Sequence, residues 1–140
     1  MIVLDTDHLS IYAEGFSADA KHLMDRLTYS GEPYGTTIIS VEEQMRGWLA
    51  LIRRRKQAHK QISAYAGLQN IVHLLADWTI LEWNGVAADA FEDFKGQKIR
   101  VGTMDLKIAA IAVSTGALLL SRNLADFEQI PGLNVENWID

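Results

Sequence analysis

The chain begins with a short apolar run, Ile2 to Leu4, that leads directly into the acidic residues Asp5 and Asp7. A continuous apolar run of this kind is typical of a β-strand that is buried on both faces of a sheet. An acid directly after such a strand lies at the carboxyl edge of the sheet, where open α/β folds bind ligands. Because a carboxylate is costly to remove from water without a positive partner, the run predicts a site for a hard divalent cation.

The alternation of strand-like and helix-like patterns continues along the chain. Strands are expected at residues 1–5, 36–39, 79–83 and 117–120, with a short edge strand at 134–138. Helical patterns cover residues 9–13, 17–28, 40–53, 57–75, 85–98 and 104–115. This order predicts an α/β fold with a single domain over residues 1–140, in which helices flank a mainly parallel central sheet of four to five strands.

Local patterns add expectations about helix ends and faces. Ser17 is expected to cap the second helix, and Ser40 to Glu43 match a capping box. Asp7 is a candidate cap for the short helix that follows it. The helix of residues 85–98 is expected to turn three side chains inward: Val86, Ala90 and Phe94.

The composition excludes some functions and leaves others open. The chain has 140 residues, no cysteine and a net charge of −5. Disulfides and thiolate metal sites are therefore excluded. No apolar run approaches the roughly 20 residues of a membrane span, and no basic leader precedes the first strand, so we expect a cytoplasmic protein without membrane contact. The acidic balance argues against non-specific nucleic-acid binding, but it permits an enzyme whose acids gather in a metal site.

Positive charge is concentrated in one segment. Five basic residues lie within eight positions, and His59 lies in the same segment. The five are Arg53, Arg54, Arg55, Lys56 and Lys60. The first interpretation is a solvated helix face. The alternative is a local patch that attracts phosphate.

Polar groups interrupt the apolar segments at four predicted sheet-edge positions. They are Asp5 after the first strand, Glu42 and Glu43 after the second, Asp105 at the start of a nearly apolar helix, and Asn123 with Asp126 after the fourth strand. Each has a structural explanation, because acids favour first helical turns and Asn and Asp favour turns. Their coincidence at one edge of a parallel sheet instead indicates a Mg²⁺ or Mn²⁺ site and metal-assisted attack on a phosphoester.

The order and spacing of these motifs resemble the PIN domain, and specifically the VapC-type ribonuclease toxins of toxin–antitoxin pairs. The resemblance extends over essentially the whole chain. The matching segments are Ile2 to Asp7, Ser40 to Gly47, Asp105 to Ala110, Leu120 to Phe127, and Ile130 to Leu133.

This resemblance implies an acidic cleft in which Asp5, Glu43 and Asp105 bind the metal ion. Asn123 falls where many members of the family have Asp, so either Asn123 or Asp126 is expected to supply a fourth ligand. Supporting roles are implied for Thr6, Asp7 and Ser40, whose side chains would orient the acids or a water molecule. Arg46, Lys107 and Arg122 are candidates for RNA phosphate contacts, with surface charge or carboxylate pairing as the alternative.

The resemblance also implies a reaction and partners. Water would attack the phosphorus of single-stranded RNA, with Mg²⁺ or Mn²⁺ as cofactor, to give 3′-hydroxyl and 5′-phosphate products. A homodimer is expected, together with an antitoxin whose basic side chain enters the acidic cleft.

Two alternatives start from the same residues. Asp5-Thr6-Asp7 resembles the motif of haloacid-dehalogenase-type phosphatases, in which Asp5 would be a covalent nucleophile and Asp7 a general acid. However, no acidic pair follows Lys107 as those enzymes require. Asn123 allows a second alternative, a PIN-like binding module with weakened catalysis.

Overall fold

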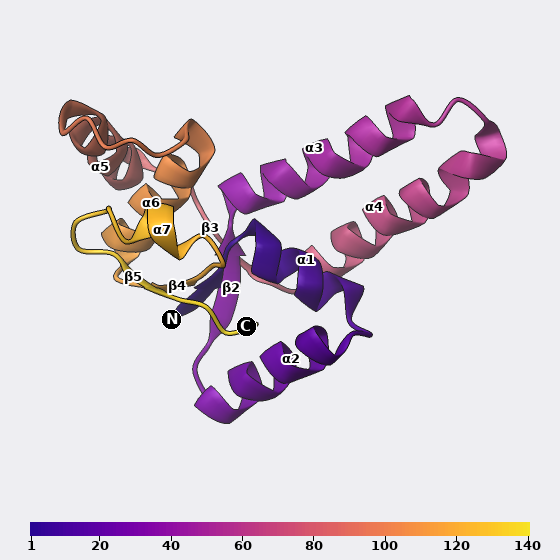
Figure 1. The fold of residues 1–140 in the computed structure, drawn as a ribbon, viewed down its shortest axis with the longest axis horizontal. Coiled ribbons are helices and arrows are strands. Elements are labelled where there is room, and N and C mark those ends of the chain that lie inside the picture. The colour runs from indigo at the N-terminus through magenta and orange to yellow at the C-terminus, as the bar shows by residue number, and fades with distance from the viewer.

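The computed structural model describes residues 1–140 and contains a five-stranded parallel sheet (Figure 1). The order across the sheet is β3-β2-β1-β4-β5, so β1 is central and β5 is an edge strand. The strands are β1 (Ile2–Leu4), β2 (Tyr34–Thr37), β3 (Thr79–Leu81), β4 (Leu118–Leu120) and β5 (Asn134–Glu136). All four pairings are parallel, which confirms the predicted α/β fold.

Helices connect every pair of successive strands. They are α1 (Thr6–Glu14), α2 (Ala18–Ser30), α3 (Ile38–Arg54), the 3₁₀ helix η1 (Ala58–Gln61), α4 (Ile62–Leu75), α5 (Gly85–Gly96), α6 (Thr103–Thr115) and α7 (Leu124–Phe127). None of them combines the length and the apolar character that a membrane span requires.

The core lies in two layers, one on each face of the sheet. Alternate residues of β1 point to opposite faces: Val3 packs with α5, α6 and α7, whereas Ile2 and Leu4 pack with α1, α2 and α4. Helix α6 contributes most to the first layer, because its side chains from Leu106 to Ala112 are almost all buried. This burial of α6 agrees with its nearly continuous apolar sequence.

Helices α3 and α4 form an antiparallel hairpin that extends away from the sheet (Figure 1). Their close approach depends on Gly67, because a Cβ atom at this position would lie 2.3 Å from the Trp48 ring. The hairpin therefore needs glycine at residue 67 in order to pack Trp48 between its two helices.

The predicted start of α3 is wrong. The strand expected at residues 36–39 ends at Thr37, and the helix begins at Ile38 instead of Ser40. The Thr37 side chain is the cap, since it accepts a hydrogen bond of 3.1 Å from the Ser40 N–H. The β-branched pair Ile38-Ile39 favours a strand locally, but the Thr37 cap and the burial of Ile39 favour the helix.

Two further local predictions also need correction, whereas Ser17 does cap α2 as expected. Asp5, not Asp7, caps α1, because its carboxylate accepts from the Thr6 N–H at 2.7 Å. In α5, Val86 is 63% exposed, and the buried residues are Ala87, Phe91 and Phe94. The inward face is therefore displaced by one residue at the start of this helix.

Candidate metal centre

The strand order reverses direction between β1 and β4, and this position is the topological switch point of the sheet. Loops that leave neighbouring strands there diverge to opposite sides and open a crevice at the carboxyl edge. Asp5 follows β1 and Ser121 follows β4, so both lie at the crevice. The Asp5 N–H donates to the Leu120 carbonyl at 2.9 Å, which holds the two strand ends together.

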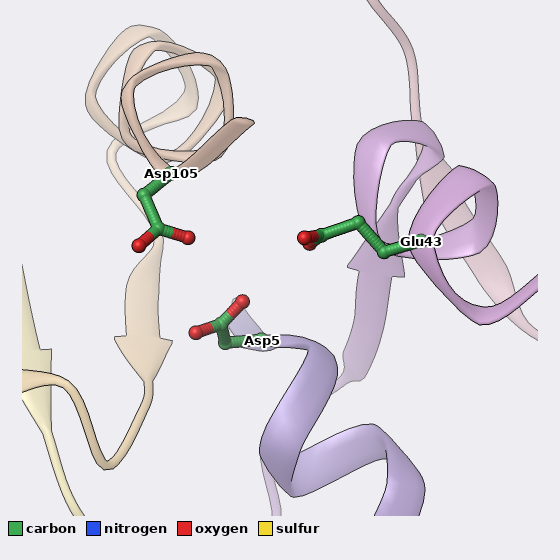
Figure 2. A group of neighbouring side chains, drawn as sticks. All are labelled: Asp5, Glu43 and Asp105. Atoms are coloured by element: carbon green, nitrogen blue, oxygen red, sulfur yellow. The ribbon is translucent and has the colours of Figure 1, made fainter. Parts of the chain in front are cut away.

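Three carboxylates from separate elements meet at this edge. Asp5 caps α1, Glu43 lies on α3, and Asp105 lies in the first turn of α6. Figure 2 shows their side chains pointing toward one another, and one oxygen of each lies within 4.8 Å of the others. None of the three forms a salt bridge within the protein.

Asp5 is the most buried of these acids, with 5% of its surface exposed. Burial raises the pKa of its carboxyl to about 7, and the negative charges of Asp7 and Asp105 raise it as well. Hydrogen bonds to its two oxygens oppose this rise. The Ser121 hydroxyl donates at 2.7 Å and the Thr6 N–H at 2.7 Å.

Glu43 is positioned by the helix that follows β1. The Thr6 hydroxyl donates to its carboxylate at 2.6 Å. The next residue, Gln44, is buried and donates to the Thr6 carbonyl at 3.3 Å and to the Ser10 hydroxyl. These contacts fix α3 against α1 and direct the Glu43 carboxylate toward Asp5.

Asn123 lies between two acidic residues, Asp105 and Asp126. Its amide nitrogen donates to Asp105 at 3.1 Å and to Asp126 at 3.0 Å. Burial raises the pKa of Asp105, the Asn123 hydrogen bond lowers it, and the charges of Asp126 and Asp7 raise it further. Asn123 therefore bridges two like charges, and its role as a fourth metal ligand stays a prediction, as does that of Asp126.

Asp7 and its neighbour His8 link the start of α1 to Trp138, which follows β5. The Trp138 N–H donates to Nε2 of the fully buried His8 at 3.1 Å, so Nδ1 carries the hydrogen that bonds Asp7 at 2.6 Å. Burial acts to raise the pKa of Asp7, but hydrogen bonds from His8 and the Arg122 N–H outweigh it and lower the pKa. Asp7 is therefore held as a carboxylate, 3.4 Å from the Ser121 hydroxyl.

The donor set fits a hard divalent cation. Only carboxylate oxygens converge, and Mg²⁺ and Mn²⁺ prefer such ligands. The 4.8 Å limit on the separation of these oxygens is close to the distance of about 4.2 Å between opposite oxygens of an octahedral Mg²⁺ site. The raised pKa values of Asp5 and Asp105 describe acids that lack a compensating positive charge.

The side chains of the other predicted residues, Ser40, Arg46, Lys107 and Arg122, make no hydrogen bond or salt bridge to the three acids. Ser40 is buried, but its hydroxyl contacts Thr37 at 3.4 Å and none of the acids. The three predicted RNA-contacting residues are engaged within the protein: Arg46 pairs with Glu42, Lys107 lies over the Trp83 ring, and Arg122 pairs with Asp19 and Asp140. Arg46 and Arg122 thus pair with carboxylates, one of the alternatives that the sequence left open, and the RNA contacts of all three residues stay predictions.

Sequence reasoning missed Ser121 as a functional candidate. This serine is fully buried, donates to Asp5 and accepts from the Asn123 N–H at 3.0 Å. Its position directly after an apolar strand, like that of Asp5, was the available signal.

Comparisons with known proteins identify relatives by sequence. The chain is 36% identical over 73 residues to Ribonuclease VapC2 of Haemophilus influenzae and 31% identical over 113 residues to Ribonuclease VapC1 of Rickettsia felis. The first match covers 49% of this chain and 55% of the relative, and the second covers 77% and 78%. The chain thus spans only about half the length of the Haemophilus relative. No protein-family profile matches the chain.

Solved structures share the fold. A chain in the DNA-bound VapBC structure from Salmonella typhimurium superposes with a TM-score of 0.77 at 22% identity, with 99% of each chain covered. VapBC-1 from nontypeable Haemophilus influenzae also gives 0.77, at 21% identity and 100% coverage of each.

Proposed function

The chain belongs to the VapC ribonuclease family, and on that premise we propose that it is a metal-dependent endoribonuclease acting on single-stranded RNA. The observation that carries the proposal is the convergence of Asp5, Glu43 and Asp105 at the switch point of the sheet. These three residues would hold a Mg²⁺ or Mn²⁺ ion.

A bound divalent ion supplies Lewis-acid polarisation of the phosphodiester and lowers the pKa of water. The protein residues hold the acids in place for this chemistry. Ser121 and the Thr6 N–H fix the two oxygens of Asp5, and the Thr6 hydroxyl fixes Glu43. Asp105 lies in the first turn of α6, beside the other two acids, where it would orient the attacking water.

The family membership also supports an antitoxin partner and a homodimer. The solved structures with this fold include VapBC complexes from Salmonella typhimurium and Haemophilus influenzae.

Neither the phosphatase nor the binding module with weakened catalysis is favoured over the ribonuclease. The relatives are named ribonucleases. For a phosphatase, Asp5 would have to act as a nucleophile, but both of its oxygens already accept hydrogen bonds and it lies among other acids. This environment suits a metal ligand better than a covalent nucleophile.

The test is cleavage of a labelled single-stranded RNA by the purified protein with Mn²⁺ and with chelator. We expect cleavage with Mn²⁺ and none in chelator. The rate of cleavage should fall roughly 100-fold or more in Asp5→Asn, because that change removes a charged ligand. Asp25→Asn is the matched control, since Asp25 is exposed on α2. Cleavage by Asp5→Asn that persists in chelator would refute the proposal.

A further inference from the structure

The α3–α4 hairpin differs in charge from the rest of the protein. Between Gln44 and Ala76 the sequence has no Asp or Glu and six basic residues: Arg46, Arg53, Arg54, Arg55, Lys56 and Lys60. The rest of the chain has the other seven basic residues and all 18 acidic ones. A phosphate chain that approaches this acidic protein is therefore attracted more strongly at the hairpin than over the rest of the surface, where acidic residues outnumber basic ones.

The positive charge at the tip of the hairpin is free. Arg53, Arg54 and Lys56 are exposed, and they form no salt bridge or side-chain hydrogen bond. Arg55 is different, because it donates to the Lys60 carbonyl at 3.0 Å and to the Ser63 hydroxyl at 2.6 Å. Arg55 thus holds the turn, while its neighbours remain available to a ligand.

A groove connects this tip to the metal centre. Glu43, Gly47, Leu51 and Arg54 follow one another on α3 at intervals of four, four and three residues, and so they share one helix face. Together with Thr6 they line a groove of about 360 Å³. From Glu43 to Arg54 the helix rises about 16 Å.

Gly47 keeps the middle of this groove open. It is exposed, and a Cβ atom added there would have no neighbour within 4 Å, so packing does not require glycine. Glycine inside a helix costs about 1 kcal/mol relative to alanine. Its presence at this point leaves bare backbone that a ligand can approach closely.

We propose that the α3–α4 hairpin is an RNA-binding arm. The RNA backbone would extend from the acids, past Gly47, to Arg53, Arg54 and Lys56 at the tip. This inference rests on the proposed ribonuclease function and adds to it the part of the protein that holds the substrate outside the cleavage site. It adds Arg53, Arg54 and Lys56 to the phosphate contacts predicted from the sequence, Arg46, Lys107 and Arg122, which in the free protein pair with carboxylates or lie over an aromatic ring.

The test compares two variants that lose the same charge. Arg53→Gln/Arg54→Gln changes the arm, and Lys21→Gln/Lys98→Gln removes two exposed lysines from α2 and from the turn after α5. In chelator, binding of a single-stranded RNA of about 20 nucleotides should weaken roughly tenfold in the arm variant, and its salt slope should fall by about 1.4, since each phosphate contact contributes about 0.7. The control should match the wild type.

Cleavage with Mn²⁺ adds a test of position. The arm variant should lose roughly tenfold in kcat/KM on the long RNA but cleave a substrate of about three nucleotides like the wild type, because the short RNA does not reach the tip. If the two variants bind RNA equally well, the hairpin does not bind RNA and the proposal is overturned. The same result is expected if the tip of the hairpin binds an acidic protein segment instead. A wild-type protein that binds RNA through the arm without cleaving it would refute the ribonuclease function alone.

Discussion

The hydroxyl of Ser121 donates a 2.7 Å hydrogen bond to Asp5 across 116 positions of sequence. It is the largest influence that lowers the pKa of this buried acid. The bond therefore helps to keep Asp5 ionised, as its proposed role as a metal ligand requires.

Ser121→Ala should weaken metal binding. Without the hydroxyl the pKa of Asp5 rises further above about 7, so fewer molecules carry the carboxylate at neutral pH. We expect a roughly tenfold weaker Mn²⁺ affinity by calorimetry at about pH 7, and a smaller difference at about pH 9. Ser114→Ala is the control, because Ser114 bonds only the Ile111 carbonyl. A pH-independent loss would contradict this role.

The metal-free protein should become less stable as the pH rises. Asp5 has a folded pKa of about 7 against an ordinary value of 3.8, so folding favours its neutral form. Its stabilising contribution, on the order of a few kcal/mol, is complete below about pH 4 and is lost as the pH rises to about 7. Asp105 acts in the same direction, and Asp7, whose pKa is lowered, acts in the opposite one.

Melting temperatures in chelator across this range check that dependence. Asp5→Asn should give a flatter profile and a higher melting temperature than the wild type above about pH 7, because no buried charge forms at residue 5. Parallel profiles for the two proteins would show that Asp5 does not titrate in this way.

Glu43 and Glu42 offer a matched pair of neighbours. Glu43→Gln should lower RNA cleavage roughly 100-fold or more, since it removes a charge from the proposed metal site. Glu42→Gln should retain activity, because Glu42 pairs with Arg46 outside the cluster. The measurement is the initial rate of cleavage with Mn²⁺. Similar losses of rate in both variants would show that Glu43 has no special role compared with Glu42.

Thr6→Val should reduce the rate without unfolding the protein. The change keeps the shape of the side chain but removes the 2.6 Å bond that orients Glu43. A decrease of about 10- to 100-fold is expected in kcat, and Thr6→Ser should restore most of it. If serine and valine behave alike, the hydroxyl does not position Glu43.

His8→Phe should lower the free energy of unfolding by about 2–4 kcal/mol, because it leaves the Asp7 carboxylate and the Trp138 N–H without their shared partner. Urea unfolding measures the loss. His73→Phe, at an exposed position on α4, should change the value by less than about 0.5 kcal/mol.

Much of the fold could be predicted because the strands are short apolar runs and α6 is apolar on nearly every face. The acids could be singled out because each interrupts such a segment. The start of α3 could not be predicted, since Thr37 becomes a cap only when the chain turns at the sheet edge. The pairing of Arg122 with Asp19 and Asp140 was equally hidden, because these residues meet only in the folded protein.

The central place of β1 has a consequence for synthesis on the ribosome. β1 leaves the ribosome before its neighbour β4 and before Ser121, which follow more than a hundred residues later. Until then one edge of β1 stays unpaired, and Asp5 lacks both the Leu120 carbonyl and the Ser121 hydroxyl. A nascent chain therefore cannot complete the surroundings of Asp5 until residues 118–121 have left the ribosome, more than a hundred residues after β1 itself.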